Sequence, residues 1–286
     1  MSRIEDKFKG LRAKNEKAFI GYITAGLPKP EYTLDLCFAL VKGGADMIEL
    51  GIPFSDPMAD GRTIQESCYM ALEKGVRPMS VLKIVKKVKQ ELDVPLVLLS
   101  YYNPIFRMGL EGFLGMAKDS GVDGLIIPDL PVDEAEEYIR FARRYGIDTI
   151  FLASPNTPEN RLKRIVDNTR GFLYLVSLYG VTGAREKLES LTMALVSKFS
   201  SLINGKVNLA VGFGISRPEH VRTIISNGAD GVIVGSGIMK IVNRSGDLKD
   251  VLEKVEAYVR DLKDATKICK EDIGINSSKG HVGPLG

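Results

Sequence analysis

"DMIELGIPFSDPMADGRTIQ", residues 46–65, combines a short apolar run, a loop rich in Pro, Ser and Asp, and the start of a helical pattern. The apolar run predicts a buried strand, yet Glu49 lies in the middle of it. A charge inside a core costs several kcal/mol unless it is paired, neutralised or used. The segment therefore predicts a strand–loop–helix unit and, within it, a candidate catalytic acid.

This alternation of strand and helix repeats along the whole chain. Apolar strands are expected at 18–26, 46–51, 95–102, 124–130, 147–154, 172–178, 207–214 and 230–237. Amphipathic segments, expected to be helices, lie at 30–43, 63–92, 110–120, 132–145, 158–169, 187–203, 217–227 and 248–263. Strands that are apolar on both faces are typical of a parallel sheet covered by helices. About eight such units predict a single closed (β/α)8 TIM barrel, with an open doubly wound sheet as the alternative.

A Gly–Asp signal recurs before four of the expected strands, as GGAD, SGVDG, YGID and NGADG. In each, Gly is expected to end a helix and Asp to open the approach to the next strand. Residues 1–16 precede the first strand, and Ile4, Phe8 and Leu11 recur at helical spacing. This spacing predicts an extra N-terminal helix.

Composition excludes several classes of function. A formal net charge of +3 is too small to indicate nucleic-acid binding. Cys37, Cys68 and Cys269 lack CxxC spacing, which indicates a reducing compartment rather than a disulfide framework or a zinc site. The charged N-terminus lacks the apolar segment of a signal peptide, and no apolar stretch is long enough to span a bilayer. We therefore expect a cytoplasmic protein with one domain over residues 1–265 and a polar, Gly-rich tail at 266–286.

Period-two alternation places Glu49 on the opposite side of its strand from Ile48 and Leu50. In a barrel, those two side chains face the helices and Glu49 points into the mouth, where apolar surroundings raise a carboxyl pKa. The alternative is a structural Glu paired to a basic residue, but the neighbouring expected strands contain none. Glu49 is therefore predicted to donate and accept protons.

A second acid, Asp60, lies in the loop after this strand. Thr63 and Glu66 have the spacing of a capping box, which predicts that the next helix begins near residue 63 and leaves Asp60 in the loop. Asp56 is an equal candidate on composition, and spacing does not choose between the two acids.

Three Gly-rich segments follow the last three expected strands: YGVTGA (179–184), VGFGIS (211–216) and VGSGI (234–238). Gly lets backbone amides approach an anion closely, and the loops after the seventh and eighth strands frequently bind phosphate in this barrel class. The alternative is three tight turns without a ligand. Only two His residues occur, His220 and His281, and no Lys lies within an expected strand, so metal and Schiff-base chemistry are not expected. The chain therefore predicts proton transfer on a phosphorylated small molecule.

Residues 49–65, ELGIPFSDPMADGRTIQ, closely resemble the signature of the tryptophan synthase α subunit family. The resemblance continues from Phe8 to Leu262 through AFIGYITAGLP, SYYNPI, IIPDLP, YLVSLYGVTGA, GFGIS and ADGVIVGS. It implies a TIM barrel that cleaves indole-3-glycerol phosphate into indole and glyceraldehyde 3-phosphate in L-tryptophan biosynthesis. By this resemblance, Glu49 shuttles the protons, and Asp60 accepts the indole N–H and stabilises the positive charge on nitrogen.

The resemblance also implies a set of substrate-binding residues: Tyr22, Leu99, Ile127, Tyr174, Thr182, Gly183, Phe213, Gly214, Gly235 and Ser236. Thr182 would orient the aspartate from a mobile loop. The family's pattern further implies no metal and no cofactor in this chain, because pyridoxal phosphate belongs to the β chain, its partner in an α2β2 tetramer. The loops at 53–60, 103–108 and 129–133 would face that partner.

Two positions depart from the family pattern. Arg62 replaces the Pro usual before TIQ, and Gly21 replaces a Pro in the first strand. Neither residue transfers protons, so the departures concern the geometry of the Asp60 loop. Two other functions stay open: a non-catalytic subunit that activates its partner, and another phosphosugar enzyme such as an isomerase.

Overall fold

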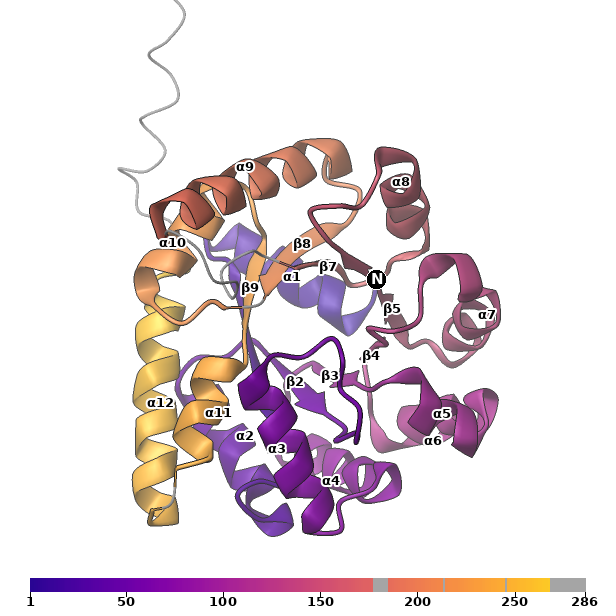
Figure 1. Cartoon of the computed structure of the whole chain (residues 1–286), viewed down its shortest axis with the longest axis vertical. Coiled ribbons are helices and arrows are strands. Elements are labelled where there is room, and N and C mark those ends of the chain that lie inside the picture. Colours follow the sequence, from indigo (N-terminus) through magenta and orange to yellow (C-terminus); the bar gives the residue numbers. More distant parts are fainter. Residues whose placement is uncertain (177–184, 213, 245, 268–286) are drawn as a thin grey trace, which may run out of the picture.

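The parallel sheet of this chain closes on itself (Figure 1). The computed structural model describes residues 1–176, 185–212, 214–244 and 246–267. The strand order is β5-β4-β3-β2-β1-β9-β8-β7-β6. β5 (Asp148–Ile150) and β6 (Leu152–Ala153) belong to one segment that is interrupted only at Phe151, so the two ends of this order meet. The predicted (β/α)8 barrel is confirmed, with its fifth strand in two pieces.

The other strands match the expected positions to within a few residues. They are β1 (Ala18–Thr24), β2 (Met47–Gly51), β3 (Leu96–Leu99), β4 (Gly124–Ile126), β7 (Phe172–Val176), β8 (Asn208–Gly212) and β9 (Gly231–Val234). Almost every residue in them is buried, because inward side chains fill the barrel and outward ones lie beneath the helices. This burial on both faces explains why the strands are apolar throughout.

Helices surround the strands in Figure 1. They are α1 (Arg3–Ala13), α2 (Thr33–Lys42), α3 (Arg62–Glu73), α4 (Pro78–Glu91), α5 (Tyr102–Met108), α6 (Leu110–Ser120), α7 (Glu136–Tyr145), α8 (Glu159–Asn168), α9 (Arg185–Ile203), α10 (Pro218–Ser226), α11 (Ser236–Val242) and α12 (Leu248–Asp264). The 3-10 turns η1 (Pro30–Tyr32) and η2 (Val132–Glu134) precede α2 and α7.

Three helix predictions differ from the structure. The single helix expected at 63–92 is two helices, because Gly75 has a φ of +77° and Pro78 starts the second one. α5 and α11 were not predicted, since each has only seven residues and too few turns to show a periodic pattern. The capping box expected at Thr63 and Glu66 is absent: α3 begins at Arg62, and its N-cap residue, Gly61, offers no side chain.

The recurring Gly–Asp signal has a clear structural role. Gly121 ends α6 in the left-handed conformation with a φ of +94°, and Gly146 ends α7 in the same way with a φ of +63°. Three of the following aspartates each accept a backbone N–H at the start of a neighbouring strand and a lysine ammonium. The pairs are Asp46 with Phe19 N (2.8 Å) and Lys263 (2.9 Å), Asp123 with Leu96 N (2.8 Å) and Lys89 (2.9 Å), and Asp230 with Leu209 N (3.0 Å) and Lys17 (3.1 Å).

The predicted N-terminal helix, α1, covers the amino-terminal ends of the strands. In Figure 1 it lies behind the strands at the centre of the ring of helices. Ile4, Phe8 and Leu11 are buried as the spacing predicted, and the Phe8 ring lies 6.0 Å from that of Phe172 at the start of β7. Because this end is closed, the accessible mouth of the barrel lies at the carboxyl ends of the strands.

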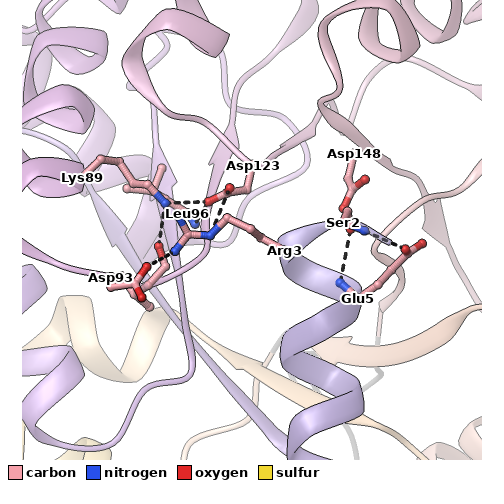
Figure 2. A network of polar contacts seen from close by, with 9 residues as sticks. Ser2, Arg3, Glu5, Lys89, Asp93, Leu96, Asp123 and Asp148 are labelled. Atoms are coloured by element: carbon pink, nitrogen blue, oxygen red, sulfur yellow. Dashed lines mark hydrogen bonds and ion pairs between the residues drawn. The ribbon is translucent and has the colours of Figure 1, made fainter.

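Polar contacts hold the start of α1 against the barrel (Figure 2). The Ser2 hydroxyl accepts the Glu5 backbone N–H at 3.2 Å and donates to the Asp148 carboxylate at the start of β5. Arg3 forms ion pairs with Asp93 and, at 3.7 Å, with Asp123. Burial raises the pKa of Asp148 to about 6, and the Ser2 hydrogen bond opposes this rise.

The carboxyl-terminal end of the described chain returns to the same side of the barrel. Thr266 is buried, its carbonyl accepts the Lys17 N–H at 3.2 Å, and the Lys267 backbone forms an antiparallel β-bridge with that of Glu16. These two residues of the expected tail therefore pack on the barrel, and 268–286 lie outside the described residues. Within the described ranges, no helix combines the length and the apolar character needed to cross a bilayer.

Candidate active site

A cavity of about 600 Å³ opens at the carboxyl ends of the strands. It brings together eight of the residues expected at the site: Tyr22, Glu49, Asp60, Leu99, Tyr174, Gly214, Gly235 and Ser236. They come from β1, β2, β3 and β7, from the loops after β2, β8 and β9, and from the first residue of α11. These side chains are far apart in the sequence, and they become neighbours because the sheet closes into a barrel.

Glu49 lies on β2 with its side chain directed into this cavity. It is 1% exposed, and its Oε2 atom has no hydrogen-bond partner within the described residues. Burial, and then the negative charge of Asp60, raise the Glu49 pKa from 4.5 to about 8. The group is therefore protonated at neutral pH and poised to donate that proton.

Asp60 approaches the same cavity from the β2–α3 loop. The Tyr101 hydroxyl donates to its Oδ2 atom at 2.9 Å and accepts the Ala59 N–H at 2.9 Å, which fixes the loop against the start of α5. Burial raises the Asp60 pKa to about 6, and the Tyr101 hydrogen bond opposes that rise. Asp60 is therefore mostly ionised at neutral pH. Its alternative, Asp56, is exposed and accepts a hydrogen bond from Ser55 at 2.5 Å.

Two tyrosines, Tyr22 on β1 and Tyr174 on β7, line the cavity. Tyr22 pairs in register with Glu49 across β1 and β2, and its hydroxyl lies 3.1 Å from that of Thr24. Burial raises the pKa of both Tyr22 and Tyr174, so both phenols remain neutral. A Cβ at Gly51 would lie 2.2 Å from the Tyr22 hydroxyl, which explains the Gly at the end of β2. The two phenol rings thus give the cavity an uncharged aromatic lining beside the two acids.

The candidate phosphate seat is formed by Gly214, Gly235 and Ser236, which line the cavity with Ser216 and Lys240. The lack of a side chain at Gly235 also leaves room for Tyr22, because a Cβ there would lie 2.9 Å from the Tyr22 ring. Three expected residues, Thr182, Gly183 and Phe213, lie outside the described residues.

Ile127 is the one described candidate that does not line the main cavity. It lines a neighbouring cavity of about 320 Å³, which shares Pro128, Leu152 and Val176 with the first. Ile126 and Pro128 line the main cavity instead. Period-two alternation explains the difference, since adjacent residues of an extended chain point to opposite sides.

A protonated carboxyl, an ionised carboxylate, an uncharged aromatic lining and a Gly-lined seat thus share one cavity. This arrangement suits acid–base chemistry on a flat aromatic group that carries an anionic tail. The described residues contain no group of three or more His, Cys, Asp or Glu side chains arranged to hold a metal ion.

Comparison with known proteins decides the family. Residues 8–267 match the family model of the tryptophan synthase alpha chain. The chain is 48% identical over 246 residues to the tryptophan synthase alpha chain of Pyrococcus abyssi, an alignment that covers 86% of this chain and 97% of the relative. This chain belongs to the tryptophan synthase alpha chain family.

Solved structures of tryptophan synthase agree in fold. The tryptophan synthase subunit alpha of Legionella pneumophila superimposes with a TM-score of 0.83 at 35% identity, covering 93% of this chain and 98% of that one. A Pyrococcus furiosus chain, from a study of mutual activation in the tryptophan synthase α2β2 complex, gives a TM-score of 0.81 at 47% identity, covering 87% and 98%.

Sequence reasoning missed several residues that line this tryptophan synthase alpha chain cavity or hold its acids. Tyr101 is visible in the sequence only as part of a strand end, and nothing there indicates its bond to Asp60. Arg62 and Lys240 line the cavity from α3 and α11. Lys240 lies on a helix too short to predict, so no sequence signal placed it at the site.

Proposed function

We propose that Glu49 and Asp60 carry out the lyase reaction of the tryptophan synthase alpha chain family in this protein. As a member of that family, the chain is a carbon–carbon lyase of L-tryptophan biosynthesis, which cleaves indole-3-glycerol phosphate to indole and glyceraldehyde 3-phosphate. The observation that carries the proposal is that two carboxyls with raised pKa values, about 8 and about 6, face one cavity.

Glu49 acts first as an acid and then as a base. It donates its proton to indole C3, which gives an indolenine whose nitrogen is positively charged. The resulting carboxylate takes the proton of the glycerol hydroxyl next to the breaking bond. The C–C bond then breaks, its electrons return to the ring, and the hydroxyl carbon becomes the aldehyde. Glu49 ends protonated, so the cycle consumes no proton.

Asp60 supports the charge that this step creates. Its carboxylate accepts the indole N–H and stabilises the cation on nitrogen, in a cavity where burial strengthens the interaction. Because the substrate ring itself accepts the electrons, we propose that the chain needs neither a metal nor a cofactor of its own.

We further propose how the substrate lies in the cavity. The indole ring fits between Tyr22, Leu99 and Tyr174, with Ile126 in the wall where Ile127 was expected. We still propose that Ile127 and Phe213 contact the substrate, from the edge of the site. The phosphate is held by backbone amides at Gly214, Gly235 and Ser236, with Gly183 completing the seat and Thr182 orienting Asp60.

The same proposal assigns a partner. The tryptophan synthase β chain would bind over the mouth in an α2β2 assembly and would hold the pyridoxal phosphate. Two large apolar side chains near the mouth support this: Met58, in the β2–α3 loop, is 81% exposed, and Phe106, in α5, is 66% exposed. Both lie within the segments expected to face the partner. We place the assembly in the cytoplasm, in keeping with the buried free thiols of Cys37 and Cys68.

Indole release from indole-3-glycerol phosphate, measured with and without a β chain, tests this function. We expect slow release by the chain alone and faster release when the β chain is added, because the partner would order the loops at the mouth. No indole in either case would contradict the lyase assignment and favour a non-catalytic subunit. Turnover only of other phosphosugars would instead favour the isomerase alternative.

Removing the Tyr101 hydroxyl should shift the pH dependence of this reaction. The hydrogen bond from Tyr101 lowers the Asp60 pKa, so Tyr101→Phe raises it and moves the acid limb of the kcat/KM profile to higher pH. A lost hydrogen bond of ~1 kcal/mol raises that pKa by about 0.7, which corresponds to an approximately threefold loss at pH 6 and almost no loss at pH 8. The matched control is Tyr69→Phe, on the exposed face of α3. An acid limb that does not move in Tyr101→Phe would contradict the assigned contact.

A further inference from the structure

One basic side chain in the cavity has no role in the chemistry derived above. Lys240 lies on α11 and lines the cavity together with Gly214, Gly235 and Ser236. Phosphate-ester substrates carry close to two negative charges at neutral pH. Backbone amides alone leave that charge without an ionic partner.

The rotation of α11 brings Lys240 to the cavity. Ile238, Met239 and Val242 are buried against the barrel, and the Met239 sulfur accepts the Thr24 N–H of β1 at 3.4 Å. Lys240 lies four residues after Ser236, so the two share one face of the helix, and helical side chains lean toward the preceding turn. The Lys240 ammonium can therefore reach back toward the Ser236 end of the cavity.

Comparison with the other charged side chains in the cavity identifies Lys240 as the candidate partner for a bound anion. The acids there are Glu49 and Asp60, and the second base is Arg62. Both basic side chains are exposed, but Arg62 already donates to the Glu66 carboxylate at 2.8 Å. Across the described part of the chain, no carboxylate forms an ion pair with Lys240. Lys240 is thus the cation available to an anion in the seat.

We propose that Lys240 is a substrate-binding residue, whose ammonium pairs with the phosphate of the phosphorylated substrate. This rests on the proposed function and extends it from backbone amides to a charged side chain. The pairing is made equally with substrate and with the transition state, because the phosphate does not take part in the bond changes. It therefore contributes to binding rather than to the chemical step.

The test compares Lys240→Met and Lys240→Arg with a matched control, Lys249→Met. Lys249 lies in α12 with its side chain 83% exposed, and it does not line the cavity. Loss of a charged hydrogen bond predicts that Lys240→Met raises KM for indole-3-glycerol phosphate about tenfold, with kcat within about twofold of the parent. Lys240→Arg should recover most of the affinity, and Lys249→Met should match the parent.

Two ligands, inorganic phosphate and indole, separate this proposal from the lyase assignment. Lys240→Met should weaken binding of inorganic phosphate, with a smaller dependence on salt, and should leave indole binding unchanged. An unchanged KM and unchanged phosphate affinity in Lys240→Met would overturn the proposal. A fall in kcat with KM unchanged would overturn it as well. If the parent released no indole but Lys240→Met still lost phosphate affinity, the lyase assignment would fall and the Lys240 site would stand.

Discussion

Replacing Glu49 by Gln is expected to lower indole release by about 10²–10⁴-fold, the usual contribution of a positioned acid–base group. Gln fills nearly the same volume but cannot donate a proton to indole C3 or accept one from the glycerol hydroxyl. Substrate binding should change little, because Tyr22, Leu99 and the phosphate seat are untouched. The loss should therefore be in kcat, measured by indole formation at saturating indole-3-glycerol phosphate. A Glu49→Gln variant with parental turnover would remove Glu49 from the mechanism.

The same variant should remain folded, which separates lost chemistry from lost structure. Because the Glu49 pKa is about 8 in the folded chain against 4.5 for an ordinary Glu, the folded chain keeps a proton there that the unfolded chain releases. Stability falls as pH rises between those two values, and Gln, which does not ionise, removes that fall. We therefore expect Glu49→Gln to show an equal or higher Tm at pH 8. A Tm well below that of the parent would mean that Glu49 stabilises the fold instead.

Replacing Asp60 by Asn should lower kcat by about 10²–10³-fold, as expected when one group that stabilises developing charge is removed. The Asn carbonyl can still accept the indole N–H, but it carries no charge to stabilise the cation on nitrogen. The variant should also lose the acid limb of the pH profile that Asp60 ionisation produces near pH 6.

Asp56→Asn is the matched control for Asp60→Asn. Both positions lie in the β2–α3 loop, but Asp56 is exposed and does not line the cavity. We expect its indole release to match that of the parent. The opposite result, with Asp56→Asn impaired and Asp60→Asn active, would exchange the two assignments that the sequence left open.

The fold was largely predictable because apolar periodicity acts locally. Each strand is buried on both faces, so its composition alone marks it, and the Gly–Asp signals mark where helices end and strands begin. The errors lie where that periodicity is short or broken. Gly75 and Pro78 divide one expected helix into α3 and α4, and α5 and α11 have too few residues to show a repeat.

The candidate site was predictable only in part, because local periodicity shows which way a side chain points but not which distant residues it meets. Glu49 is conspicuous as a charge within an apolar strand, and alternation alone directs it into the barrel. Ile127 shows how small an error in position misplaces a residue. A shift of one residue along the chain moves a side chain from one cavity to the neighbouring one.

By itself, the sequence determined the barrel, the buried acid and the resemblance that named the family, since each depends on residues adjacent in the chain. Only the tertiary structure decided that Asp60 rather than Asp56 shares a cavity with Glu49, that Tyr101 donates a hydrogen bond to Asp60, and that Lys240 lines the cavity with Gly214, Gly235 and Ser236. These relations join residues far apart in the chain. Closure of the sheet sets their distances, burial and pKa values, and no local pattern encodes them.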